Sequence, residues 1–119
     1  MLLQGARRPI PVAFKTRRVR LDETLRRTIG ASIQSELGRF CRRVRHVFVW
    51  IEDANGPRDG SGVRCRFNLA LHPRGRFVVA AEEANEHLAV VKCAARARER
   101  LDRSLKRARS AKRRTRAIH

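Results

Sequence analysis

The chain has 119 residues, the length of one domain, and its hydrophobic fraction of 42% is enough for a modest core. It carries 29 lysines and arginines against 11 acidic residues, a net charge of +18, and arginine greatly outnumbers lysine. This composition argues against wholesale disorder and indicates a polyanionic partner, because such a surface attracts phosphate groups and releases their counterions on binding.

Other features of the sequence narrow the class of protein further. The N-terminal residues lack the apolar run of a secretory signal, and no stretch of about 20 apolar residues predicts a membrane span. Cys41, Cys65 and Cys93 are dispersed, which argues against a disulfide framework and favours a reducing compartment, so we expect a cytoplasmic protein. The cysteines and histidines also lack zinc-finger spacing, so no metal and no cofactor are expected.

The first part of the chain predicts a strand followed by a helix. Apolar and other residues alternate over residues 10–15, and the prolines there favour an edge strand or a strand start. Asp22 is positioned to cap a helix, with Glu23 in its first turn. Apolar residues then recur at helical spacing, at Leu25, Ile29, Ile33, Leu37 and Phe40.

The middle of the chain predicts three antiparallel strands. Residues 44–51 are β-branched and aromatic, and residues 63–72 alternate strictly between apolar and polar or small side chains. The loop at 55–62 is rich in glycine but lacks the Gly-Lys-Ser/Thr ending of a nucleotide-binding loop. A turn at 72–75 leads to a fourth strand over 77–81, which completes a meander.

The last part predicts a long helix capped by Asn85. One face of this helix is apolar or aromatic, at His87, Val90, Ala94, Ala97, Leu101 and Leu105. Beyond Leu105 the apolar pattern fades, so we divide the chain into a domain over 1–107 and a basic tail over 108–119. On its own, that tail is expected to be poorly ordered.

These elements predict an α+β fold of order β-α-β-β-β-α. The β-α-β unit should place its two strands parallel, with a right-handed crossover. The expected architecture is a four-stranded mixed sheet with two helices packed on one face and the other face open.

Several local strings resemble one protein family. Residues 19–26 are similar to the start of its first helix, and 47–52 are similar to its second strand. Residues 79–90 are similar to its Ala-Glu-x-x-Asp-x-Tyr-x-Ala-Ile-Asp motif. The chain departs from that motif in three places, with Asn85 for Asp, His87 for Tyr and Val91 for the final Asp. Over residues 10–107 the chain thus resembles the ribosome hibernation-promoting factor, or ribosome-associated inhibitor, family (also the sigma-54 modulation family).

The resemblance implies a function in translation regulation under stress. Members bind ribosomal RNA of the small subunit in the channel used by messenger and transfer RNA, where they inhibit translation. The basic tail, in place of a second domain, makes this chain look like a short form. We therefore expect a ribosome-binding protein that is not an enzyme, takes no small-molecule substrate, avoids membranes and is monomeric away from the ribosome.

Three sets of residues are predicted to bind RNA. The first lines the long helix about one turn apart: Lys92, Arg96, Arg100, Arg103, Lys106 and Arg107. The second follows the first helix and its exit, and is expected to merge with the first set: Arg26, Arg27, Arg39, Arg42 and Arg43. The third lies on the open sheet face, with Arg64 and Arg66 for phosphates and Phe48 and Trp50 for base stacking.

Plainer interpretations of these residues stay open. Each basic set could be a solvated surface, and the two aromatic residues could simply cover the sheet. Glu82, Glu83 and Glu86 fit the N-terminus of a helix, where carboxylates are favoured, better than a catalytic site. The main functional alternative is a general RNA- or DNA-binding module, such as a double-stranded RNA binder. An interaction protein for acidic partners and an RNA-modifying enzyme are further options, although no catalytic residues are predicted.

Overall fold

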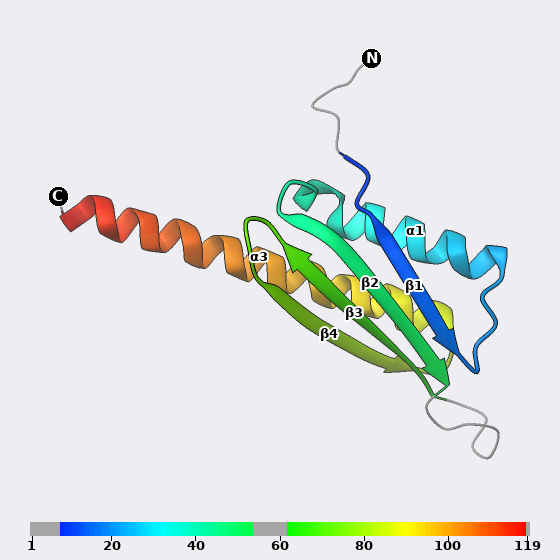
Figure 1. Cartoon of the computed structure of the whole chain (residues 1–119). Coiled ribbons are helices and arrows are strands. Elements are labelled where there is room, and N and C mark those ends of the chain that lie inside the picture. Colours follow the sequence, from blue (N-terminus) through cyan, green and yellow to red (C-terminus); the bar gives the residue numbers. More distant parts are fainter. Residues whose placement is uncertain (1–7, 54–61, 119) are drawn as a thin grey trace.

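The computed structural model describes residues 8–53 and 62–118. Within them the order of elements is the predicted one, with a short 3-10 helix, η1, added after the first helix (Figure 1). The elements are β1 (Val12–Arg17), α1 (Glu23–Leu37), η1 (Gly38–Phe40), β2 (Val44–Asp53), β3 (Val63–Leu71), β4 (Arg76–Glu83) and α3 (Glu86–Ile118).

The strands form one mixed sheet in the order β1-β2-β3-β4. β1 runs parallel to β2, with Val12 opposite Val47, whereas β2, β3 and β4 pair antiparallel. Both helices lie on the same face of this sheet and side by side, as Figure 1 shows. The predicted α+β fold, with its mixed sheet and its two helices on one face, is therefore confirmed.

Both long helices begin at the predicted caps. The Asp22 carboxylate accepts a hydrogen bond from the Leu25 N–H at 2.8 Å, and the Asn85 side-chain oxygen accepts one from the Leu88 N–H at 3.0 Å. Each contact satisfies an N–H group that has no partner inside its helix. The caps fix where the two helices start, and hence which side chains face the sheet.

The core lies between the sheet and the helix layer. Alternate side chains of the middle strands, such as Val49 and Phe67, are fully buried against the helix residues Ile29 and Leu101. This is the apolar set that the period-two and helical patterns predict, and its burial is the main stabilising contribution to the fold.

Two of the cysteines are part of this core. Cys93 on α3 donates through its thiol to the carbonyls of Cys65 at 3.6 Å and Val79 at 3.5 Å. The hydrogen bond with Cys93 and burial raise the pKa of the Cys65 thiol above its ordinary value. Cys65 is therefore held as a neutral packing group, and the two hydrogen bonds of Cys93 tie α3 to β3 and β4.

The helix α3 continues past residue 107 through the basic tail. Residues 108–118 are helical, and Figure 1 shows α3 projecting beyond the sheet. The packed first half of α3 supplies the nucleus for extending the helix, and alanine, arginine and lysine all propagate it well. Cations near a helix C-terminus also interact favourably with its dipole. The division at residue 107 remains a prediction, and the loop predicted at 55–62 lies, apart from Gly62, outside the described residues.

We predict that Leu101→Ala lowers the free energy of unfolding by about 2–5 kcal/mol, because Leu101 is fully buried and its truncation leaves a cavity. Leu88→Ala, at a position of the same helix that is 50% exposed, should change it by less than about 0.5 kcal/mol. Urea unfolding followed by circular dichroism measures both. Equal changes in the two variants would contradict this assignment of the core face.

Candidate nucleic-acid interface

The topology brings several arginines together at one end of the sheet. β2 begins at this end, and the turn between β3 and β4 lies beside it, because Val44 pairs with Leu71. The Arg43 guanidinium donates to the His72 carbonyl at 2.9 Å, and the His72 N–H donates to the Arg43 carbonyl at 2.8 Å. These two hydrogen bonds hold the basic segment after η1 against the basic β3–β4 turn.

We call this region the basic end. Its cations come from η1, the start of β2, the β3–β4 turn with the start of β4, and the neighbouring part of α3: Arg39, Arg42, Arg43, Arg45, Arg74, Arg76, Lys106 and Arg109. Residues 37–51, 66–81 and 103–119 contain no aspartate or glutamate at all. Positive charge is therefore concentrated here with little compensation, which produces a strong local field.

The opposite end of the sheet carries most of the acidic residues, and we call it the acidic end. The helix starts and the strand ends that meet there carry Asp22, Glu23, Glu52, Asp53, Glu82, Glu83 and Glu86. Cations lie among these carboxylates, so the charge of this end is largely balanced: Arg17, Arg18, Arg20, Arg26, Arg27, Arg64 and Lys92. The strand register confirms that these segments lie together, since Asp53 pairs with Val63 and Val63 with Glu83. The chain is thus polarised along its strands, with uncompensated positive charge at one end and largely balanced charge at the other, so a polyanion would be attracted more strongly to the basic end.

Two cavities open at the basic end. One, of about 350 Å³, lies between η1 and α3, and its lining includes three cations, Arg39, Lys106 and Arg109, and one carboxylate, Asp102, which pairs with Arg39. The other, of about 340 Å³, lies beside Arg42 and His72. Guanidinium groups offer paired N–H donors that match phosphate oxygens, so both cavities have the chemistry of phosphate sites.

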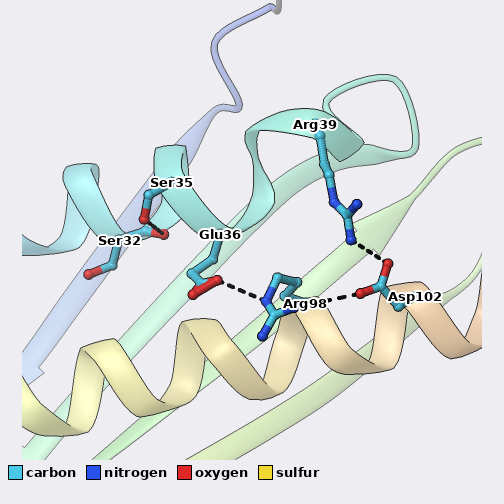
Figure 2. A network of polar contacts seen from close by, with 6 residues as sticks. All are labelled: Ser32, Ser35, Glu36, Arg39, Arg98 and Asp102. Carbon is cyan, nitrogen blue, oxygen red and sulfur yellow. Dashed lines mark hydrogen bonds and ion pairs between the residues drawn. The ribbon is translucent and has the colours of Figure 1, made fainter.

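An ion-pair network joins the two helices next to the first cavity (Figure 2). Arg98 lies between two carboxylates, with Nε 2.9 Å from Glu36 and Nη1 3.8 Å from Asp102, and Asp102 also pairs with Arg39. Exposed pairs of this kind contribute little to stability. These pairs matter more for the local charge, because they neutralise Glu36 and Asp102, the carboxylates that lie closest to the basic end.

The residues predicted on the long helix are exposed, and three of them follow the β4 edge. Lys92 lies 3.7 Å from a Glu83 oxygen, Arg96 donates to the Ala80 carbonyl, and the Arg100 guanidinium lies 4.7 Å from the centre of the Phe77 ring. The other three are exposed farther along α3: Arg103, Lys106 and Arg107. Only this second group extends toward the basic end.

The structure divides the set predicted on the first helix. Arg39, Arg42 and Arg43 belong to the basic end, whereas Arg26 and Arg27 lie near the start of α1, about 18 Å away along the helix axis. The Arg26 guanidinium lies 5.4 Å from the centre of the Phe14 ring, and Arg27 pairs with Glu23 at 3.5 Å. The cations predicted on α1 and its exit therefore meet those predicted on α3 at one end of the helices only. The ion-pair network of Figure 2 lies between the two helices where they meet.

The third predicted set lies on the uncovered sheet face. Trp50 has Lys15 and Arg66 near its ring, at 5.6 and 5.9 Å from the centroid, and Phe48 is 38% exposed. Arg64 lies farther toward the acidic end and pairs with Glu82 at 3.6 Å. The expected mixture of cations and aromatic rings is thus present on this face.

Part of the basic end is not apparent from helical periodicity. Arg45, Arg74, Arg76 and Arg109 were not singled out, because they fall in a strand start, a turn and a tail and not in one helical stripe. The predicted topology nevertheless indicates where these arginines lie. Antiparallel pairing of the second, third and fourth strands places the turn between the third and fourth strands beside the start of the second strand.

Within the described residues, no group of three or more His, Cys, Asp or Glu could hold a metal ion. In the same part of the chain, no helix combines the length and the apolar character needed to cross a membrane.

Comparison with known proteins gives matches in structure only. No family model matches the sequence, and no curated protein matches it. A ribosomal subunit interface protein from Coxiella burnetii superposes with a TM-score of 0.67 at 11% identity, over 82% of this chain and 99% of the other. The N-terminal domain of Thermus thermophilus Protein Y superposes with a TM-score of 0.64 at 18% identity, over 81% and 98%. The chain therefore has the fold of these two proteins, in agreement with the fold that the sequence resemblance implies.

Proposed function

We propose that this protein is a ribosome-associated inhibitor of translation, a hibernation factor. It binds small-subunit ribosomal RNA in the channel for messenger and transfer RNA, and it acts by occupying that channel, without catalysis. The observation that carries the proposal is the basic end, presented on a fold shared with a ribosomal subunit interface protein.

Electrostatics would supply both affinity and orientation. Cations that neutralise phosphates release counterions, which favours binding to any RNA. The carboxylates of the acidic end add direction, because they offset the cations there and weaken the attraction of that end for phosphates. A molecule polarised in this way would enter an RNA-lined channel with its basic end first.

The proposed contacts combine predicted residues with those that the topology adds. The primary set is Arg39, Arg42, Arg43, Arg45, Arg74, Arg76, Arg103, Lys106, Arg107 and Arg109. The remaining predicted cations stay secondary candidates: Arg26, Arg27, Arg64, Arg66, Lys92, Arg96 and Arg100. The proposal includes a cytoplasmic location, a monomer away from the ribosome, and no cofactor or small-molecule substrate.

We predict that Arg42→Glu combined with Arg74→Glu lowers affinity for purified small subunits at least tenfold, because both exposed arginines lie at the basic end. Arg26→Glu combined with Arg27→Glu changes the net charge equally at the other end of α1, and should lower affinity less than about threefold. Co-sedimentation in sucrose gradients at physiological salt measures both. Equal losses would show that overall charge, and not the basic end, determines binding.

We predict that the logarithm of small-subunit affinity falls linearly with the logarithm of salt concentration. Arg42→Gln combined with Arg74→Gln removes two cations that would contact phosphates. The magnitude of the slope of log affinity against log salt concentration should therefore fall by about two. At physiological salt, wild-type affinity for small subunits should remain well above that for naked duplex RNA of mixed sequence. Equal affinities for the two would favour the alternative, a general RNA- or DNA-binding module.

A further inference from the structure

The sheet face opposite the helices carries side chains in rows that cross the strands. The strand register defines a central row, Ala13, Phe48, Asn68 and Val78. The row on the acidic side of it contains Lys15, Trp50, Arg66 and Ala80. The row on the basic side contains His46, Ala70 and Arg76. Apolar groups thus lie in the middle of this face, with cations in both neighbouring rows.

The central row is open to solvent. Phe48 is 38% exposed and Val78 is 45% exposed, although both lie within paired strands. A shallow hollow of about 400 Å³ lies over β1 and β2, lined by Pro11, Val12, Ala13, His46, Val47 and Phe48. The hollow therefore offers an aromatic ring and apolar walls to a flat ligand.

The adjacent row supplies positive charge close to the ring of Trp50. Lys15 from β1 and Arg66 from β3 lie near that ring, at 5.6 and 5.9 Å from its centre. Rows on the same face are about 7 Å apart, since two residues of a strand span that length. A flat group on Phe48 would therefore have cations within reach of any phosphate attached to it.

We infer that this face binds single-stranded RNA, with an unpaired base stacked on Phe48 in the hollow and the flanking phosphates bound by Lys15 and Arg66. The inference rests on the proposed RNA-binding function and adds a second, chemically different site to it. Aromatic rings stack on bases of any sequence, provided that the bases are unpaired. The basic end grips phosphates of folded RNA, whereas the sheet face selects unpaired nucleotides.

Charge favours RNA over a second copy of the chain on this face. A face-to-face dimer would bring Lys15, Arg66 and Arg76 of both copies together, and like charges across an interface are costly. The acidic residues of the same face, Glu52 and Glu82, pair with Arg17 and Arg64 in register, two rows away from Phe48. The surroundings of the hollow are thus complementary to a polyanion.

Trp50 provides the test, because it is the only tryptophan of the chain and it lies beside the hollow. Titration with a single-stranded oligonucleotide of about eight nucleotides, within the usual site size, should quench its fluorescence. A duplex of the same length should leave the emission nearly unchanged, even where it binds the basic end. Equal quenching by both RNAs would overturn the inference.

Variants of Phe48 separate stacking from charge. Phe48→Ala should weaken single-strand binding roughly tenfold, the effect of losing one base–aromatic stack, and Phe48→Tyr should retain it. Leu88→Ala, the control, removes a 50% exposed apolar side chain on α3 and should leave it unchanged. Should Phe48→Ala fail to fold, Phe48→Leu keeps the bulk without the ring, and unchanged affinity in that variant would overturn the inference.

The remaining outcomes distinguish this site from the proposed function. Unchanged single-strand affinity in Phe48→Ala, with small-subunit binding still lost in Arg42→Glu/Arg74→Glu, would overturn only the sheet-face site. A change in Trp50 emission with protein concentration alone, accompanied by a doubled mass in sedimentation, would show that a second copy covers the face and would also overturn it. Absence of all ribosome and RNA binding would overturn both proposals.

Discussion

The distribution of charge on the surface of this protein depends on one constraint, the pairing of β2, which runs parallel to β1 and antiparallel to β3. Together with the antiparallel pairing of β3 and β4, it places the starts of α1 and α3 at the same end of the sheet, and both helices run in the same direction across one face. The same pairing places the basic segment after η1 beside the β3–β4 turn, where Arg43 and His72 hydrogen-bond to each other. Charge that is scattered along the sequence thus gives a basic end with little compensation and an opposite end at which most of the carboxylates lie among cations.

Gathering so many cations at one end disfavours the compact state by self-repulsion, and the buried core must outweigh that repulsion. The ion pairs of Arg98 with Glu36 and of Arg39 with Asp102 relieve some of it at the helix junction. Bound phosphates would relieve more. In the proposed RNA complex the folded state would be stabilised further, because a ligand that binds only the folded state stabilises it by mass action.

Most of the fold could be predicted from the sequence, because local patterns report burial directly. The alternation through Cys65, Phe67 and Leu69 and the caps Asp22 and Asn85 are read from neighbouring residues alone. The basic end depends on contacts between distant segments, so helical stripes alone did not reveal Arg74 or Arg76. The extent of α3 past residue 107 cannot be predicted from the apolar pattern, because that pattern fades after Leu105 whereas helix propagation does not require it.

The most direct test of this account is a cryo-electron microscopy structure of the full chain bound to the small ribosomal subunit. The account predicts that Arg42, Arg74 and Lys106 lie against ribosomal RNA in the channel for messenger and transfer RNA, with the acidic end turned away from the RNA. Density for the chain outside that channel, or with Glu82 and Glu83 against the RNA, would contradict it.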